Sequence, residues 1–295
     1  MTQQRAWQGK TGGGRTGQFL LLKILRRIPV TTLYPVLWFV VPFYLLFARK
    51  GRSAMWHYFR QIRHYGRFAA VISVIRNHFV FGRVVLDKFA LAAGRHDFVI
   101  ETKEQDDIES LIEDEKGFII AGSHIGNFEL LGHYLPQNKK KVNCLIYGGE
   151  NQDFQQKRDA EFARSNVQLV PIREDMTHLF AIKKALEQGE IVVCFCDRVF
   201  SDEKTVSVDF LGRNADFPTG IFRLANLFDT PVVTGFLMKE KKNHYSCYMH
   251  ILNTEDAKEN TPQKLVQRYA HSLEKVLEIH PEQWFNYFDF WKLKK

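Results

Sequence analysis

The stretch GFIIAGSHIGNFELLGHYL, residues 117–135, places a short apolar run directly before a polar turn and an amphipathic segment. This order predicts a buried strand, a hinge and a helix. His124 then lies at the end of the strand, and Glu129 lies in the first turn of the helix. A turn at Gly126 and Asn127 folds the chain back and exposes backbone N–H groups at the helix start. We expect Glu129 to hold one nitrogen of the His124 imidazole, which leaves the other nitrogen to take a proton from an alcohol.

The spacing of His124 and its carboxylate is not informative by itself, since the chain has eleven histidines and about one such match arises by chance. The same spacing occurs at His96/Glu101 and His250/Glu255. Both of these histidines lie in strand-like runs, where side chains five residues apart point to opposite faces. A histidine at a strand end is most often structural, but the Gly-Asn turn and the membrane features described below favour catalysis by His124.

From about residue 97 onward, short apolar runs alternate with amphipathic segments. The predicted strands cover residues 117–121, 142–147, 167–172, 191–196, 231–238 and 244–252, and the predicted helices cover residues 128–135, 154–164, 176–188, 218–228 and 261–279. This alternation predicts an α/β fold with helices packed on a sheet. We expect three regions: a basic N-terminus (1–52), a basic amphipathic helical region (53–96) and an α/β catalytic domain (97–295).

The positive charge of the chain is confined to its first third. The net charge is +8, but residues 1–86 contain fourteen Lys and Arg and no acid, so the remainder carries a net charge of −6. Within this basic third, Val30 to Ala48 is an uncharged run of 19 residues with basic flanks. That length just suffices to span a bilayer, although Pro35 and Pro42 would kink a spanning helix. A membrane anchor at about 30–48 follows, either spanning or interfacial.

Arginines interleave with aromatic residues through residues 56–83. This pattern suits helices that lie against anionic headgroups, while solvated helices or a nucleic-acid surface are the alternatives. The adjacent apolar anchor favours the membrane. The four cysteines all lie in apolar strand-like runs, which predicts buried free thiols and a reducing compartment rather than disulfides or a zinc site.

The segment His124–Glu129 resembles the signature of the lysophospholipid and lipid A late (lauroyl/myristoyl-type) acyltransferase family, His-x4-Asp/Glu, often written within His-x-Gly-Asn-Trp-Glu. Phe128 stands where the family has Trp. The resemblance covers most of the chain. It implies a glycerolphosphate-acyltransferase-like mixed sheet flanked by helices, behind an N-terminal apolar membrane-anchoring helix. It further implies an acyl carrier protein or coenzyme A thioester as the donor, with no metal and no cofactor.

Later blocks of the chain add candidate residues for substrate binding. Asp197 and Arg198 follow the predicted strand 191–196 at its carboxyl end, where open sheets place their sites. The resemblance implies that Asp197 matters for activity, and a surface ion pair is the alternative for these two residues. The resemblance also places Asn127, which belongs to the signature, at the substrate. Residues 162–166 resemble a family stretch that supplies a functional arginine, for which we choose Arg164 over Arg158 to neutralise a phosphate.

The block FLGRNADFPTG, residues 210–220, is also similar to a family block. Its Gly212 and Thr219 are predicted to cradle a phosphate or the thioester through backbone N–H groups at a helix start. The same residues are also explained by an ordinary loop before a helix that has Pro218 at its first position. The terminal PEQWF, residues 281–285, matches the family closely, but the NYFDFW that follows replaces a basic tail common in lipid A enzymes.

These features predict a membrane-associated O-acyltransferase that acts on a hydroxyl of a lipid A precursor-like acceptor. We expect it at the inner membrane with its catalytic domain on the cytoplasmic side. Acyl carrier protein is the expected partner, and nucleic acid is not. The altered tail leaves open a lysophospholipid, an aminolipid or a polyene product as acceptor. A catalytically silent protein that binds the membrane surface is the alternative from another class.

Overall fold

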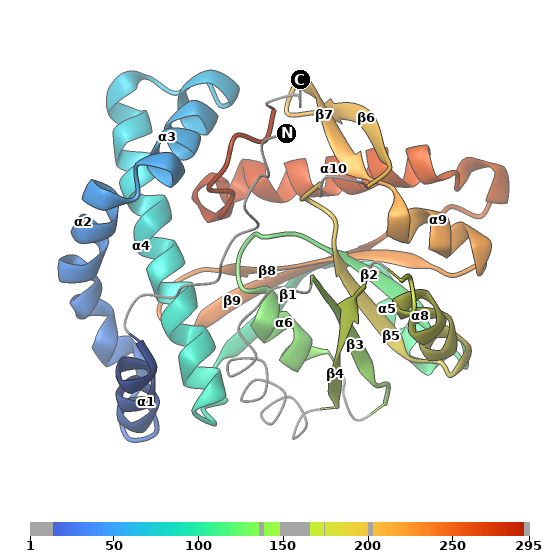
Figure 1. Ribbon diagram of the computed structural model, residues 1–295, viewed down its shortest axis with the longest axis horizontal. Helices are drawn as coiled ribbons and strands as arrows, with labels where there is room; N and C mark the ends of the chain where they lie inside the picture. The colour runs from blue at the N-terminus through green and yellow to red at the C-terminus, as the bar shows by residue number, and fades with distance from the viewer. Residues whose placement is uncertain (1–13, 136–138, 148–165, 174, 200–202, 292–295) are drawn as a thin grey trace.

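The computed structural model describes residues 14–135, 139–147, 166–173, 175–199 and 203–291, and it places a layer of helices beside a helix-covered sheet (Figure 1). The helical layer comprises α1 (Gly14–Leu25), the 3-10 helix η1 (Val30–Val36), α2 (Leu37–Phe47), α3 (Arg49–His57), the π-helical turn η2 (Tyr58–Ile62) and α4 (Arg67–Ala92). The α/β part comprises β1 (Val99–Gln105), α5 (Ile108–Glu113), β2 (Phe118–Gly122), α6 (Phe128–Tyr134), β3 (Val142–Tyr147), β4 (Val167–Ile172), α8 (His178–Glu187), β5 (Ile191–Phe195), β6 (Thr205–Phe210), β7 (Arg213–Pro218), α9 (Gly220–Leu227), β8 (Val232–Lys239), β9 (His244–Ile251), η3 (Ala257–Glu259), α10 (Pro262–Ile279) and η4 (Pro281–Gln283).

The main sheet has seven strands in the order β1-β9-β8-β2-β5-β3-β4. Strands β8 and β9 are antiparallel, and every other neighbouring pair is parallel. Ala121 of β2 pairs with Cys194 of β5, so the carboxyl ends of these two strands lie side by side. The predicted α/β class with a mixed sheet flanked by helices is confirmed.

Strand β2 is buried on both faces, which explains its continuous apolar run. Ile119 and Ala121 join the core that packs against α8, α9 and α10. Phe118 and Ile120 join a second core on the opposite face, against α5 and α6. The start of the following hinge is thereby held between two packed layers.

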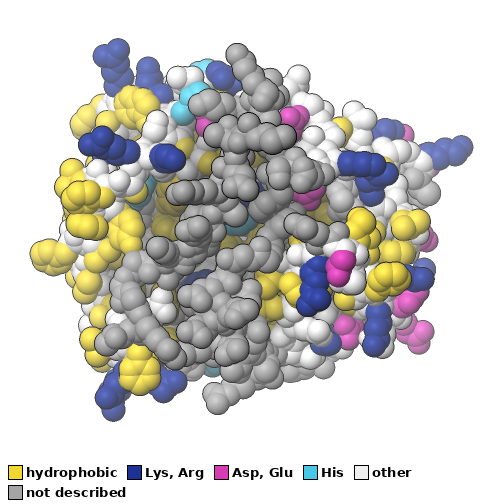
Figure 2. Space-filling view, in the orientation of Figure 1, with side chains coloured by type: hydrophobic (Ala, Val, Ile, Leu, Met, Phe, Trp, Pro, Cys, Tyr) yellow, Lys and Arg dark blue, Asp and Glu magenta, His cyan; other side chains and the backbone are white. Residues whose placement is uncertain are grey.

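The helical layer packs against the α/β part on one side and leaves an apolar surface on the other (Figure 1). Tyr58 and Phe59 belong to the same core as α10, so the layer is not a loose extension. In contrast, α2 exposes five large apolar side chains: Trp38, Phe39, Phe43, Leu46 and Phe47. Hydrophobic side chains gather on the left edge of Figure 2, where Figure 1 shows α2. Residues 30–47 and 67–92 are both long and apolar enough to cross a membrane by length and composition. The predicted apolar N-terminal helix is present, and it is divided between η1 and α2 at Val36.

Several sequence expectations differ from the structure. Residues 205–218 form the hairpin β6–β7, which the sequence analysis missed, and Pro218 ends β7 instead of opening a helix. His96 precedes β1 and does not lie in a strand. The helix expected at 154–164 falls outside the described residues.

Candidate active site

The imidazole of His124 and the carboxylate of Asp197 meet at the carboxyl ends of β2 and β5. His124 Nδ1 lies 2.7 Å from Asp197 Oδ1. The other carboxylate oxygen accepts hydrogen bonds from the backbone N–H of His124, at 2.9 Å, and from the hydroxyl of Ser123, at 2.8 Å. With Nδ1 donating to Asp197, Nε2 is the nitrogen that can accept a proton.

The surroundings of Asp197 keep its carboxyl group ionised. Its side chain is 1% exposed. Burial by itself raises the pKa of this carboxyl, but the charge and hydrogen bonds of His124 together with the charge of Arg198 hold the net pKa well below the usual value. A buried carboxylate of this kind fixes the tautomer of the histidine and balances the charge of an imidazolium.

Aromatic side chains surround the His124 ring, whose side chain keeps 21% of its surface exposed. The centroid of the His124 ring lies 4.9 Å from that of the Phe195 ring and 5.9 Å from that of the Phe128 ring. Phe128 and Phe195 also contact each other edge to face. The imidazole is therefore partly exposed to solvent and has apolar neighbours, which suit an acyl chain better than a charged group.

The turn predicted after His124 is confirmed. Gly126 has a φ of +53°, and a Cβ at this position would lie 2.1 Å from the carbonyl oxygen of Leu237. Only glycine fits this close approach without strain. Asn127 then caps α6, because its side-chain oxygen accepts a hydrogen bond from Leu130 N at 3.2 Å.

The exposed amides expected at this turn are not available to a substrate. Gly126 N donates to the carbonyl of Gln283, and Asn127 N donates to the carbonyl of Leu237. Asn127 itself is 2% exposed and both polar atoms of its amide are engaged. This burial argues against the predicted substrate contact of Asn127 and indicates a positioning role.

Glu129 does not reach the expected nitrogen of His124. Its carboxylate forms an ion pair with Lys88 of α4, whereas Asp197 occupies Nδ1 of the imidazole. The physical reason is the direction of the first turn of α6, which aims the Glu129 side chain at α4. The structure therefore corrects the expected pairing of His124, and it assigns the orienting contact to a residue 73 positions along the chain.

Arg198 follows Asp197 directly in the chain and is partly buried. Its guanidinium carbon lies 5.8 Å from the centroid of the Phe288 ring, a cation–π distance. Among the described residues, no hydrogen-bond partner reaches its Nε. Arg198 therefore stays a candidate donor for an anionic group of a substrate.

The remaining predicted residues lie elsewhere or outside the described part of the chain. Leu211 and Gly212, both with positive φ, form the two-residue turn of the β6–β7 hairpin. Gly212 is thus not at a helix start, contrary to expectation. Thr219 occupies the N-cap position of α9, but its backbone N–H and its hydroxyl both donate to the carbonyl of Lys204, at 2.9 and 3.0 Å. Arg164 falls outside the described residues.

Two supports of the hinge escaped the sequence analysis. Gln283, from the terminal PEQWF block, accepts from Lys239 N at 2.8 Å and donates to Lys239 O at 2.7 Å. Asp87 is buried at 1% exposure and pairs with the side chain of Lys239. One signal was in the sequence, since Asp87 is the first acid of the chain and interrupts an apolar helix.

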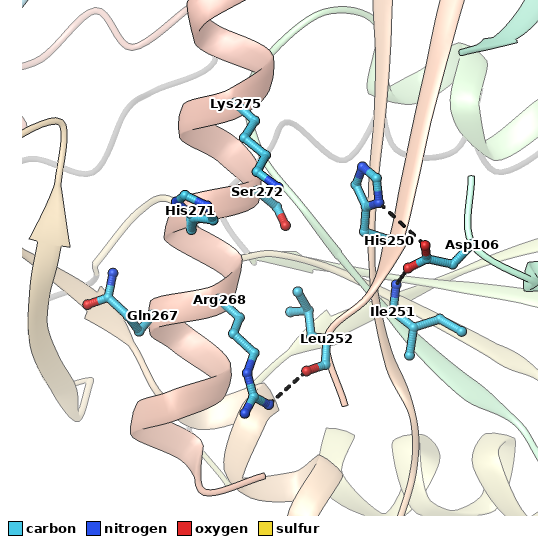
Figure 3. A pocket seen from close by; sticks show the side chains of 9 residues that line it. All are labelled: Asp106, His250, Ile251, Leu252, Gln267, Arg268, His271, Ser272 and Lys275. Atoms are coloured by element: carbon cyan, nitrogen blue, oxygen red, sulfur yellow. Dashed lines mark hydrogen bonds and ion pairs between the residues drawn. The ribbon is translucent and has the colours of Figure 1, made fainter. Parts of the chain in front are cut away.

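A separate cavity of about 490 Å³ lies between the end of β9 and α10 (Figure 3). Its lining includes Asp106, which accepts from the backbone N–H of Ile251, and Arg268, whose guanidinium donates to the carbonyl of Leu252. Ile251 pairs with Val233, at the start of β8, whereas the hinge contacts Leu237, near its end. The cavity therefore lies at the end of the sheet opposite to His124.

Comparison with known proteins assigns the family. The family model described as bacterial lipid A biosynthesis acyltransferase matches residues 76–293. The comparison with curated proteins gives no match. A solved structure, the 1-acyl-sn-glycerophosphate (LPA) acyltransferase PlsC from Thermotoga maritima, is similar with 13% identity over 90% of this chain and 99% of that chain, at a TM-score of 0.39. That score is too low to carry an argument, so the assignment rests on the family match. Because this match spans well over half of the chain and contains His124 and Asp197, the protein belongs to the bacterial lipid A biosynthesis acyltransferase family.

Proposed function

We propose that the protein moves a fatty acyl chain from an acyl thioester to a hydroxyl group of a lipid A precursor-like acceptor. One observation carries the proposal: the buried Asp197 holds Nδ1 of His124, whose partly exposed ring lies against the ring of Phe195. An oriented, neutral imidazole is the usual general base for an alcohol. The family supplies the acyl transfer.

The transfer proceeds in two proton movements. Nε2 of His124 takes the proton of the acceptor hydroxyl while the oxygen attacks the thioester carbonyl carbon, and Asp197 balances the imidazolium charge. Collapse of the tetrahedral intermediate breaks the carbon–sulfur bond, and the departing thiolate takes the proton from the imidazolium. Arg198, at the edge of the site, is our candidate to stabilise the oxyanion or an acceptor phosphate.

The surroundings of the site support direct transfer without an acyl-enzyme. The hydroxyl of Ser123 is committed to Asp197, and the residue is 2% exposed. Cys196 is 1% exposed, and its burial raises the pKa of the thiol well above the usual value. Neither group is an accessible, activated nucleophile.

We place the protein at the cytoplasmic side of the inner membrane, with acyl carrier protein or coenzyme A delivering the acyl chain. The exposed apolar side chains of α2 (Figure 2) and the basic first third support contact with an anionic lipid surface. All four cysteines are free thiols, which suits a reducing compartment.

The pairing of Glu129 with Lys88 leads to a prediction that separates two roles for Glu129. If the ion pair holds α6 against α4, we expect Glu129→Gln and Lys88→Gln to lower turnover by similar factors, because each removes one half of the same contact. Initial rates of acyl transfer measure this. If Glu129→Gln lowers turnover by a factor on the order of 10²–10⁴ while Lys88→Gln turns over at a near-normal rate, Glu129 instead assists His124 directly.

The apolar surface of α2 leads to a prediction about membrane binding. We expect the triple variant Phe39→Gln/Phe43→Gln/Phe47→Gln to leave the membrane fraction, because each buried Phe contributes roughly 1.5–3 kcal/mol. Fractionation of cell extracts at low and high salt measures the change. The matched control replaces three other exposed apolar residues, Met176, Phe180 and Leu227, with Gln and is expected to stay bound. Unchanged membrane binding of the α2 variant would contradict the anchoring role.

The reaction itself is tested with the purified, full-length protein in detergent or lipid discs. Acyl carrier protein and coenzyme A thioesters are offered with a lipid A precursor, a lysophospholipid or an aminolipid, and lipid products are weighed by mass spectrometry. We expect one acceptor to gain one acyl chain. Intact-mass analysis with donor alone is expected to show unmodified protein. A stoichiometric acyl adduct that acceptor removes would overturn direct transfer, and no acylated lipid from any pair would overturn the proposed function.

A further inference from the structure

A buried polar cluster joins the helical layer to the sheet next to the turn that follows His124. Its centre is Asp87 of α4, whose carboxylate accepts hydrogen bonds from the hydroxyls of Tyr34, at 2.6 Å, and of Tyr245. The ammonium of Lys239, from the end of β8, pairs with the same carboxylate. The side chains of Asp87 and Lys239 are 0% and 2% exposed.

The charged groups of the cluster have further polar and aromatic partners. The Lys239 ammonium also donates to the Tyr34 hydroxyl, at 3.0 Å, and to the carbonyl of Lys242, at 2.5 Å. It lies 4.6 Å from the centroid of the Tyr245 ring. Removing an ion pair from water is costly, and apolar side chains of similar volume often stabilise a core as well or better. Stability alone is therefore a weak explanation for this cluster, and geometric specificity is the stronger one.

Two hydrogen-bonded paths lead from the cluster to the hinge after His124. In the first, the amide of Asn127 donates to the Tyr245 hydroxyl at 3.1 Å. In the second, the backbone of Lys239 binds the side chain of Gln283, whose own carbonyl accepts from Gly126 N at 3.1 Å. Gly126 and Asn127, two and three residues after His124, are thus held from the same buried point.

We propose that Tyr245 is a positioning residue of the reaction: seated on the Asp87–Lys239 ion pair, it holds Asn127 and thereby sets the place of His124 relative to the helical layer. The tyrosine hydroxyl suits this role because it donates to a carboxylate and accepts from an amide at once. A catalytic base must be held within a fraction of an ångström of its productive place. This inference rests on the proposed general-base role of His124.

The test compares three variants in the full-length protein. Tyr245→Phe removes the hydroxyl and keeps the ring. Asn127→Ser removes the contact with Tyr245 and keeps a good capping oxygen for α6. Tyr248→Phe is the matched control: it lies on the same strand and is also buried, but its hydroxyl contacts His280 at 3.2 Å on the other face of the sheet.

Hydrogen exchange followed by mass spectrometry measures the hinge, and steady-state kinetics measure the reaction. We expect faster exchange in a peptide covering residues 124–131 for Tyr245→Phe and Asn127→Ser, with kcat lowered by about tenfold or more and KM nearly unchanged. The kcat of the double variant should fall no further than that of the less active single variant, because both changes break the same path. Tyr248→Phe should match the wild type in both measurements.

Unchanged exchange in Tyr245→Phe would overturn the proposal, as would equal loosening in Tyr248→Phe or a loosened hinge with normal kcat. Because exchange requires no turnover, the hinge measurement stands even if the wild type transfers no acyl chain. Failure of the proposed function is in this way distinguished from failure of the positioning role.

Discussion

His124→Ala is expected to lower the rate of acyl transfer by a factor on the order of 10²–10⁴, because it removes the general base of the proposed mechanism. Asp197→Asn should cause a loss of the same order. The amide cannot balance an imidazolium charge, and it favours the wrong tautomer of His124. Initial rates with the purified protein measure both effects, and circular dichroism checks that the variants are folded.

The sequence offers a matched control for this experiment. His250→Ala changes a histidine with the same spacing to a glutamate, His250/Glu255, but His250 lines the cavity at the opposite end of the sheet. We expect its turnover to be close to that of the wild type. Near-normal turnover of His124→Ala would refute the general-base mechanism, and an equal loss in His250→Ala would show that the assay reports folding instead of chemistry.

Gly126→Ala is expected to destabilise the protein by on the order of 3–5 kcal/mol, the range of severe point mutations. The added Cβ would lie 2.1 Å from a backbone oxygen of β8, at a residue with a φ of +53°. Neither the hinge nor β8 can move without breaking the hydrogen bond between Asn127 N and Leu237 O. Thermal unfolding in detergent measures the loss, which should appear as a large fall in Tm or as failure to fold.

Gly132→Ala provides the comparison for this glycine. It lies in α6, six residues further on, where a Cβ would meet nothing within 4 Å. Alanine is favoured over glycine inside a helix by about 1 kcal/mol, so we expect unchanged or slightly raised stability. A Gly126→Ala protein as stable as Gly132→Ala would show that the close approach to β8 does not constrain the hinge.

Local sequence patterns predicted most of the elements because burial leaves a strong periodic signal. Val142–Tyr147 and Val167–Ile172 were predicted with the bounds that β3 and β4 have. The sequence analysis misses the hairpin β6–β7 because its polar, partly exposed strands lack that signal, and it interprets residues 210–217 as a loop that leads into a helix at Pro218. Local propensity identifies an element best where one or both faces are buried.

Local sequence patterns were enough to predict the α/β class, the apolar N-terminal helix, the turn at Gly126 and the place of His124 between a buried strand and that turn. Each of these depends on residues close together in the chain. The partner of His124 depends on the packing of the whole chain, because the order of β2 and β5 in the sheet brings Asp197 to Nδ1 and the direction of α6 sends Glu129 to Lys88. The same holds for the cluster of Asp87, Lys239 and Tyr245. Its members come from three elements, and charges so far apart in sequence meet only after the sheet and α4 have packed together.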